Sequence, residues 1–258
     1  MKVLITGASG GIGLLTAITL ANRHHLVYLT VHKEEEKERI KKLIERLKFS
    51  NIEVLCIDIT SKDDRNKLLN LNFDCLINNA ASAMGGSVLE SNFEKVRDLY
   101  EVNVFSSFEL IQKVYKKFRK NKRGRIIVLS SLAAYFPVPF LGVYSSSKAS
   151  IRSLMASLQI EEKLLDNSIS FSLVEPGLFH TGFNQYMLSY IPDDKAFTNS
   201  REQIYKIENA LVTILEKKNL TSIVTKIILA VEEENPKSVY RAPFLQALFC
   251  KIYSIFRS

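Results

Sequence analysis

The sequence predicts an α/β fold in which a doubly wound parallel sheet lies between two layers of helices. Short apolar runs recur along the chain, a helical pattern follows nearly every run, and a glycine-rich turn joins the first run to the first helix. Continuous apolar strands of this kind are typical of parallel sheets that are covered on both faces. At 258 residues, with 47% hydrophobic and 24% charged residues, the chain is long enough for one such domain.

The order of the elements follows from these patterns. We expect strands over residues 2–6, 26–31, 52–57, 74–78, 125–130, 168–173 and 238–240. We expect helices over residues 11–22, 34–48, 92–120 and 143–165, a short helix after Ser61, and two helices between about residue 200 and the last strand. No internal repeat or low-complexity linker interrupts the chain, so we expect a single domain over 1–258.

The composition narrows the classes of partner and compartment. The net charge is +8, and one basic cluster over residues 113–125 surrounds the end of a predicted helix, where cations complement the helix dipole. We therefore expect no nucleic acid partner. Cys56, Cys75 and Cys250 are far apart in sequence, which indicates reduced packing residues in a reducing compartment.

The first residues enter a strand directly, and no uninterrupted run of about 18 apolar residues occurs. We expect a cytoplasmic protein with neither a signal peptide nor a transmembrane span.

A glycine-rich turn, TGASGGIG (6–13), follows the first predicted strand. Gly7, Gly11 and Gly13 let the backbone approach a pyrophosphate closely, and the free N–H groups of the following helix favour an anion. Such a turn alone is a weak signal, but its place between a strand and a helix of an α/β chain makes it a stronger indication of a dinucleotide site.

Tyr144 and Lys148 lie one helical turn apart in YSSSK, on a predicted helix. An ammonium beside a phenol favours the phenolate, so we expect Lys148 to lower the pKa of Tyr144 toward neutrality. The spacing alone is equally compatible with a polar helix surface. Ser131, thirteen residues before Tyr144, is by itself an ordinary hydroxyl after a strand.

Together these motifs resemble the short-chain dehydrogenase/reductase family over residues 1–181. The turn at 6–13 is similar to the family's T-G-x-x-x-G-x-G, NNAA (78–81) to its N-N-A-G, YSSSK to its Y-x-x-x-K, and PGLFHT (176–181) to its P-G-x-x-x-T. Ala81 departs from the family's glycine. The resemblance implies a Rossmann fold, a nicotinamide cofactor and hydride transfer between that cofactor and a carbonyl or an alcohol.

The resemblance also implies roles for individual residues. The catalytic group comprises Asn103, Ser131, Tyr144 and Lys148, with Tyr144 as general acid/base and Asn103 supporting a water that connects Lys148 to solvent. The remaining cofactor contacts, together with Tyr144 and Lys148, fall on Gly7, Ser9, Gly11, Ile12, Gly13, Asp58, Ile59, Asn79, Ala80, Pro176, Gly177 and Thr181. His180 is expected to be a loop residue near the nicotinamide.

The end of the second strand bears on the choice of nicotinamide. It reads Thr30-Val31-His32-Lys33 and carries no acid before Glu34. An acid at this place binds the ribose hydroxyls of NAD, whereas His32 or Lys33 could pair with the 2′-phosphate of NADP. Lys33 is also compatible with a solvated lysine before a helix. We expect NADP(H), with NAD(H) left open.

Residues 182–220 are expected to cover the substrate, and Phe183 and Met187 are the candidate contacts, together with Ser131 and Tyr144. Apolar side chains suit an apolar carbonyl or alcohol of lipid, steroid or retinoid type. Core packing beneath the cover would explain the same residues.

The tail over residues 243–258 combines apolar residues at helical spacing with basic ones. It resembles the hydrophobic C-terminal helix of steroid- and retinol-type family members and suits a peripheral membrane contact. Packing on its own domain or across a dimer is the alternative.

The sequence thus predicts an NADP(H)-dependent oxidoreductase acting on a small apolar carbonyl or alcohol. Homodimers or homotetramers would pair through the helices at 92–120 and 143–165, as in the family. The alternative is a catalytically silent NAD(P)-binding sensor or a membrane-associated scaffold of the same fold.

Overall fold

A seven-stranded parallel sheet organises the chain, with strand order β3-β2-β1-β4-β5-β6-β7. The structure is a computed structural model and describes residues 1–165, 168–189 and 201–256. The strands are β1 (Lys2–Ile5), β2 (Leu26–Val31), β3 (Ile52–Cys56), β4 (Cys75–Asn78), β5 (Gly124–Leu129), β6 (Ile169–Pro176) and β7 (Val239–Ala242). The expected strands are therefore all present, with boundaries shifted by a few residues.

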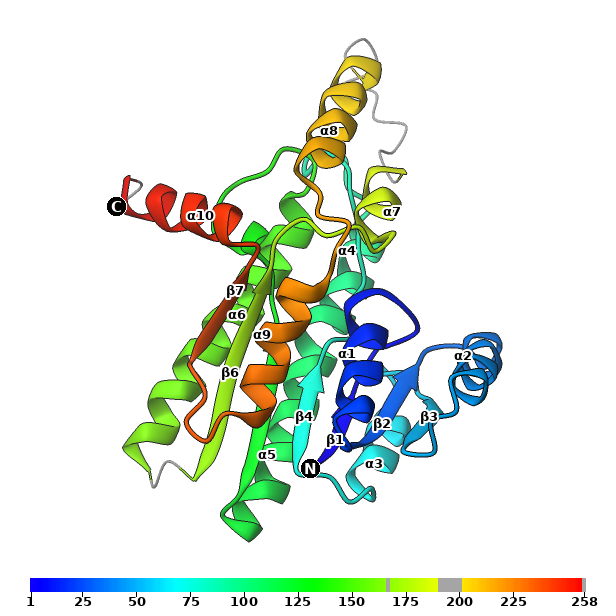
Figure 1. Cartoon of the computed structure of the whole chain (residues 1–258). Helices are drawn as coiled ribbons and strands as arrows, with labels where there is room; N and C mark the ends of the chain where they lie inside the picture. The colour runs from blue at the N-terminus through cyan, green and yellow to red at the C-terminus, as the bar shows by residue number, and fades with distance from the viewer. Residues whose placement is uncertain (166–167, 190–200, 257–258) are drawn as a thin grey trace.

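Helices cover both faces of this sheet (Figure 1). They are α1 (Gly11–Asn22), α2 (Glu34–Arg46), α3 (Lys62–Leu69), α4 (Phe93–Tyr100), α5 (Ser107–Asn121), α6 (Gly142–Leu164), α7 (Phe183–Ser189), α8 (Arg201–Leu215), α9 (Thr221–Glu232) and α10 (Phe244–Phe256). A short 3₁₀ turn, Leu132–Ala134, follows β5.

Alternating strand residues feed two separate cores. Val3 and Ile5 of β1 pack with α1, α2 and α9 on one face, whereas Leu4 packs with α3, α5 and α6 on the other. A strand buried on both sides reads as a continuous apolar run, which is why the sequence showed no alternation. The predicted three-layer, doubly wound fold is confirmed.

The helix expected over 92–120 is interrupted by a π-helical segment, Glu101–Ser106, between α4 and α5. A π turn adds one residue to the helical repeat and rotates the side chains that follow it. Asn103 is thereby buried at 2% exposure, while Phe105 stays 60% exposed. A continuous helix is what the pattern predicted, and the buried amide is the physical reason for the departure.

The sheet reverses its winding at β1, which has β2 on one side and β4 on the other. At such a switch point the connections to the two neighbouring strands leave on opposite faces, and a crevice forms beyond the carboxyl ends. The glycine turn lies at this position.

Two further expectations concern the membrane and the cysteines. Among the described residues, none of the helices combines the length and the apolar run that crossing a bilayer would require. Cys56, Cys75 and Cys250 are free thiols, as expected.

Candidate active site

The glycine turn lies against the end of β4 and against the loop after β6. Gly7 and Gly11 have φ of +63° and +53°, a left-handed conformation that favours glycine. A Cβ on Gly7 would lie 2.5 Å from the Cα of Ala80, and one on Gly11 would lie 3.0 Å from the Cβ of Thr181. The turn can therefore take this path only with glycines at these positions.

Side chains at the ends of β1 and β4 hold the turn in place. The hydroxyl of Thr6 accepts hydrogen bonds from the N–H groups of Asn79 (3.1 Å) and Ala80 (3.0 Å). The Asn79 amide in turn donates to the carbonyls of Thr6 (2.9 Å) and Gly7 (2.7 Å). These bonds leave the N–H groups at the start of α1 directed at the crevice, which is the arrangement that binds a pyrophosphate.

At the edge beside β2 and β3 the structure brings His32 close to Asp58. The His32 Nδ1 lies 3.9 Å from an Asp58 oxygen that also accepts hydrogen bonds from the N–H and hydroxyl of Thr60. Arg39 of α2, which we did not single out in the sequence, donates from its guanidinium to the carbonyl of Ser9 at 2.6 Å. His32, Arg39 and the turn thus form one exposed edge, at which the Arg39 guanidinium supplies a positive charge.

Several predicted cofactor positions lie beside the crevice without lining its cavity. Lys33 is exposed at the start of α2, and Ala80 supports the turn from behind. The side chain of Ile59 is buried at 7% exposure, and its carbonyl accepts a hydrogen bond from Arg65 at 2.6 Å. Because its side chain is buried and its carbonyl is already bonded, Ile59 has little surface left with which to contact a cofactor.

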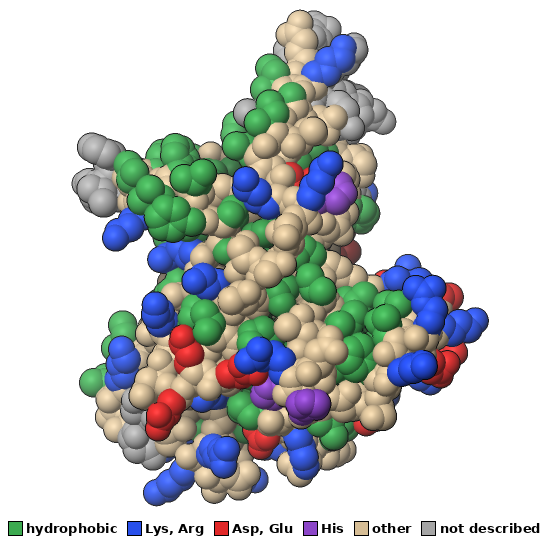
Figure 2. Space-filling view, in the orientation of Figure 1, with side chains coloured by type: hydrophobic (Ala, Val, Ile, Leu, Met, Phe, Trp, Pro, Cys, Tyr) green, Lys and Arg blue, Asp and Glu red, His purple; other side chains and the backbone are tan. Residues whose placement is uncertain are grey.

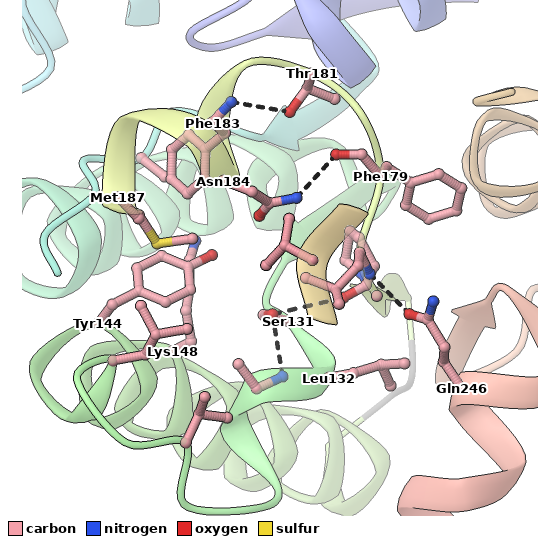
Figure 3. Close-up of a pocket in the computed structure, with 18 of the residues that line it drawn as sticks. Ser131, Leu132, Tyr144, Lys148, Phe179, Thr181, Phe183, Asn184, Met187 and Gln246 are labelled. Carbon is pink, nitrogen blue, oxygen red and sulfur yellow. Dashed lines mark hydrogen bonds between the residues drawn. The ribbon is translucent and has the colours of Figure 1, made fainter. Parts of the chain in front are cut away.

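Tyr144 and Lys148 lie on α6 and face the cavity together with Ser131 (Figure 3). Tyr144 is 7% and Lys148 4% exposed, and the Lys148 ammonium lies 5.9 Å from the centre of the Tyr144 ring. Lys148 donates to the carbonyl of Leu129 at 3.2 Å, and Ser131 caps the turn after β5 by accepting from the N–H of Ala133 at 3.1 Å. The three polar groups thus converge from two elements.

The ionisation of this pair differs from the expectation. Burial raises the pKa of Tyr144 to about 12, opposed in part by a hydrogen bond with Ser131. Burial also lowers the pKa of Lys148 to about 8, and the ammonium has no counterion among the groups that shift it. The expected lowering of the Tyr144 pKa by Lys148 is therefore not what the structure gives, because burial dominates the shift and Lys148 is not among the groups that change the pKa of Tyr144.

Asn103 lies behind Tyr144 and Lys148. Its amide accepts from the N–H of Ser82 (2.7 Å) and donates to the Ser82 carbonyl (3.0 Å) and to the hydroxyl of Ser147 (3.0 Å). Ser147 in turn donates to the carbonyl of Tyr144 at 2.7 Å. The Asn103 side chain connects the π segment, the loop after β4 and α6.

The glycine turn, Ser131, Tyr144 and Lys148 border a cavity of about 1160 Å³. It extends from the glycine turn, past Ser131, Tyr144 and Lys148, to apolar side chains of the surrounding loops and helices. Most of the predicted site residues line it, namely Gly7, Ser9, Gly11, Ile12, Gly13, Asn79, Ser131, Tyr144, Lys148, Pro176, Gly177, Thr181, Phe183 and Met187.

Phe183 and Met187 of α7 cover the end of the cavity at Tyr144. The Phe183 ring lies 5.6 Å from the Tyr144 ring, and Met187 packs in the same apolar cluster. Residues 190–200 of the expected cover lie outside the described residues. His180, expected as a loop residue, pairs with Glu216 at 2.6 Å.

A buried charge cluster at the end of β6 was not predicted. Glu175 is fully buried and pairs with Arg152 of α6 (3.1 Å) and Arg241 of β7 (2.6 Å). The Tyr135 hydroxyl lies 2.8 and 2.9 Å from its two oxygens. Arg152, Tyr135 and Arg241 lie 23, 40 and 66 positions from Glu175 in the sequence. No local sequence pattern therefore indicates that they form a cluster.

The residues present fit a dinucleotide cofactor. The turn is narrow where added side-chain atoms would collide with Ala80 after β4 and with Thr181 in the loop after β6, and its glycines from Gly7 to Gly13 line the cavity. Gly10, which begins α1, has no atom within 4 Å of the place a Cβ would occupy. That space could take a phosphate.

Comparison with known proteins identifies the family. The model for the short chain dehydrogenase family matches residues 1–190. A 3-ketodihydrosphingosine reductase of Bacteroides thetaiotaomicron is 28% identical over 258 aligned positions, which cover 96% of this chain and 90% of that protein.

Solved structures agree in fold. A short chain dehydrogenase/reductase from Burkholderia phymatum in complex with NAD superposes with a TM-score of 0.81 at 20% identity, over 97% of this chain and 91% of that one. A short-chain dehydrogenase from Sphingobium yanoikuyae in complex with NADPH gives 0.75 at 22% identity, over 100% and 95%. The chain belongs to the short-chain dehydrogenase family and is an NAD(P)-dependent oxidoreductase.

Proposed function

We propose that this protein transfers a hydride between NADP(H) and a carbonyl or secondary alcohol of an apolar lipid, with Tyr144 as the general acid/base. The observation that carries the proposal is the convergence of Ser131, Tyr144 and Lys148 in the same cavity as the glycine turn. That geometry supports a hydride acceptor carbon facing the nicotinamide and a carbonyl oxygen facing the phenol.

The nicotinamide, when bound, supplies the hydride that reduces the carbonyl carbon. Tyr144 delivers its phenolic proton to the carbonyl oxygen, and Ser131 donates a hydrogen bond to the same oxygen and stabilises its developing charge. The raised pKa of Tyr144 keeps the proton on the phenol at neutral pH, which suits reduction. Lys148 would hold the ribose of the bound cofactor and support proton return to Tyr144, with Asn103 fixing the helix behind them.

An apolar substrate is supported by the cavity wall. Beyond the polar group at Tyr144, the wall is formed mainly by hydrophobic side chains, namely Leu132, Phe136, Val138, Leu141, Phe179, Phe183, Met187, Leu188, Leu215, Leu245 and Phe249. Binding acyl or ring carbons against such a wall is favourable because it removes apolar surface from water. The 3-ketodihydrosphingosine reductase that is similar over nearly the whole chain suggests a long-chain lipid ketone as the substrate class.

NADP(H) is supported by the cationic edge next to β2. His32, Lys33 and Arg39 lie there, and the Glu36 carboxylate accepts the N–H groups of His32 (3.2 Å) and Lys33 (3.3 Å). A 2′-phosphate would meet Lys33 and Arg39 at this edge, whereas β2 itself ends without the acid that usually receives the ribose hydroxyls of NAD, and the nearby Glu36 carboxylate is engaged by main-chain N–H groups.

A peripheral membrane contact is supported by the outer face of α10. On this face Phe244, Leu248 and Ile252 are 76%, 41% and 46% exposed, and none of the three lines the cavity. Hydrophobic side chains gather on α10 and on α8 in the space-filling view, with basic side chains nearby (Figure 2). An apolar face with cations beside it favours an anionic lipid surface.

The inner face of the same helix packs on its own domain, through rings of Phe249 and Tyr253 that lie 6.1 and 6.0 Å from Phe136. The side chains of Ile255 and Phe256, and Arg257, lie outside the described residues. A homodimer through α5 and α6 stays a prediction, which a monomeric mass in sedimentation would contradict.

The first prediction tests the acid/base. Tyr144→Phe removes the proton that reduction requires and should lower kcat by about 10²- to 10⁴-fold on a ketone that the wild type reduces, with NADPH affinity nearly unchanged. Tyr100→Phe is the matched control, since the Tyr100 hydroxyl bonds only Ser146 at 2.9 Å on the outer side of α6. Near-normal turnover by Tyr144→Phe would contradict the role of Tyr144 as the acid/base.

The alternative function has its own test. A wild-type protein that binds NADPH but turns over no ketone, aldehyde or steroid would favour a catalytically silent sensor.

The second prediction uses the pKa of Lys148, which is about 8 in the fold against 10.5 in the unfolded chain. Between these values the unfolded chain binds more protons, so unfolding becomes less favourable as the pH rises. The destabilisation by the buried ammonium is complete below pH 8 and vanishes toward pH 10.5. Without cofactor, Lys148→Met should therefore raise the free energy of unfolding at pH 7 by up to about 3 kcal/mol, at ~1.4 kcal/mol per pKa unit.

Urea titrations of both proteins at pH 7 and pH 10 measure this difference. The exposed Lys42→Met is the control, and it should change stability little at either pH. An equal gain for Lys148→Met at both pH values would show that packing, not charge, is responsible.

The third prediction concerns the choice of cofactor. Wild-type protein should bind NADPH more tightly than NADH, and Lys33→Ala and Arg39→Ala should each weaken NADPH by about five- to tenfold while leaving NADH nearly unchanged. Lys42→Ala, farther along α2, controls for the change in net charge. Tighter binding of NADH by the wild type, measured by fluorescence titration, would overturn the assignment.

The fourth prediction concerns the membrane surface. The double variant Phe244→Glu/Leu248→Glu places two acids on the outer face of α10 and should abolish cosedimentation with phosphatidylcholine–phosphatidylserine vesicles. Neither residue lines the cavity, so turnover of a small water-soluble ketone should stay near wild type. Leu89→Glu alters another leucine that is 86% exposed and should leave vesicle binding intact. Equal cosedimentation of all three proteins would contradict the proposal.

A further inference from the structure

Gln246 of α10 connects two segments that border the cavity. Its Oε1 accepts a hydrogen bond from the N–H of Leu178 at 2.8 Å, and its Nε2 donates to the carbonyl of Leu215 at 2.8 Å. Leu178 belongs to the loop after β6, and Leu215 is the last residue of α8. A single amide thus satisfies two main-chain groups that lie 37 positions apart in the sequence. Figure 3 shows the first of these bonds, at the Gln246 oxygen.

Gly177 lies in close contact with Gln246. A Cβ on Gly177 would lie 2.0 Å from the Gln246 Oε1 and 3.0 Å from the Cδ of Pro243. The Gly177 N–H donates to the carbonyl of Ala242 at 2.8 Å, two residues before α10. A side chain at position 177 would therefore displace the Gln246 amide from its present place.

The end of α8 and the loop after β6 also hold each other directly. The Lys217 N–H donates to the Leu178 carbonyl (3.0 Å), and the His180 N–H donates to the Lys217 carbonyl (3.0 Å). The carboxylate of Glu216, the residue before Lys217, pairs with His180 and accepts a hydrogen bond from the side-chain amide of Asn184 in α7 at 2.7 Å. Gln246 adds α10 as the third side of this junction.

Three residues of the junction, Leu178, Leu215 and Gln246, line the cavity itself. Leu178 follows Pro176 and Gly177 and precedes Thr181, which packs against Gly11 of the glycine turn. A shift of the Leu178 N–H would therefore move both the cofactor side and the substrate side of the cavity.

We infer that Gln246 is a positioning residue of the active site: it fixes the loop at 177–181 against the end of α8, so that α10 is part of the catalytic apparatus. The inference rests on the proposed function in taking that loop as the place where the nicotinamide is held. It predicts that α10 affects catalysis through one amide, in addition to any contact made by its outer face.

The two hydrogen bonds can be separated by substitution. Gln246→Leu removes both and should lower kcat/KM for 2-decanone about tenfold or more and weaken NADPH binding severalfold. Gln246→Glu keeps an acceptor for the Leu178 N–H but places a carboxylate against the Leu215 carbonyl. It should therefore raise the KM for 2-decanone while leaving NADPH affinity near wild type.

Gly177→Ala offers an independent test, since its methyl group would displace the Gln246 amide. Its loss in NADPH affinity should be several times smaller in a Gln246→Ala background than in the wild type, because the two changes remove the same contact. Leu248→Gln, on the exposed side of α10 and outside the cavity, is the matched control and should match the wild type in NADPH affinity, turnover of soluble 2-decanone and thermal unfolding.

Three measurements decide the result: NADPH fluorescence titration, steady-state kinetics with 2-decanone, and thermal unfolding. The inference is overturned if Gln246→Leu stays within about twofold of wild type in kcat/KM and NADPH affinity, or if Gln246→Glu alters cofactor and substrate parameters equally. Should Gln246→Leu fail to fold, Gln246→Glu and the Gly177→Ala cycle decide alone. An active Tyr144→Phe would instead refute the proposed chemistry and leave the NADPH results on Gln246 valid.

Discussion

The contact between Gly7 and Ala80 is the constraint on which the arrangement of the site depends. A Cβ on Gly7 would lie 2.5 Å from the Ala80 Cα, so the first turn can touch the end of β4 only as glycine. The Thr6 hydroxyl, which accepts the N–H groups of Asn79 and Ala80, secures the same approach from within the sheet. With the turn held there, the start of α1 points across the switch point toward the ends of β5 and β6. Ser131, Gly177 and Thr181 follow those two strands.

Buried charge distinguishes the two sides of this site. Glu175 at the end of β6 is fully buried, yet it has Arg152, Arg241 and the Tyr135 hydroxyl as partners. Lys148, also buried, donates to the carbonyl of Leu129 at 3.2 Å and has no carboxylate partner in the part of the chain that the structure describes. A buried charge without a counterion costs free energy, and such groups are concentrated where function requires them. The paired carboxylate stabilises the frame, whereas the Lys148 ammonium keeps donors with which a ligand could form further hydrogen bonds.

Local patterns were sufficient to predict the sheet and the sequence motifs, because strands buried on both faces and glycine turns have short-range signatures. They were insufficient for the π segment, whose cause is the burial of Asn103 against Ser82 and Ser147, 21 and 44 residues away. They also gave the wrong direction for the pKa of Tyr144, since the spacing of Tyr144 and Lys148 shows their proximity but not their loss of water. Gln246 left no signal at all, because a glutamine that binds main-chain groups imposes no residue type on its partners.

The tail helix combines two properties on different faces. Gln246, Cys250 and Tyr253 recur at helical spacing and face the domain, with Cys250 only 2% exposed. Phe244, Leu248 and Ile252 recur on another face and remain exposed. Folding explains the first set but gains nothing from the second, whose exposure favours an apolar partner outside the domain. The first face holds the Leu178 N–H through Gln246, and the Ala242 carbonyl just before the helix accepts the Gly177 N–H. Because both contacts end in the loop beside the glycine turn, a partner bound to the second face would act on the helix that supports this loop.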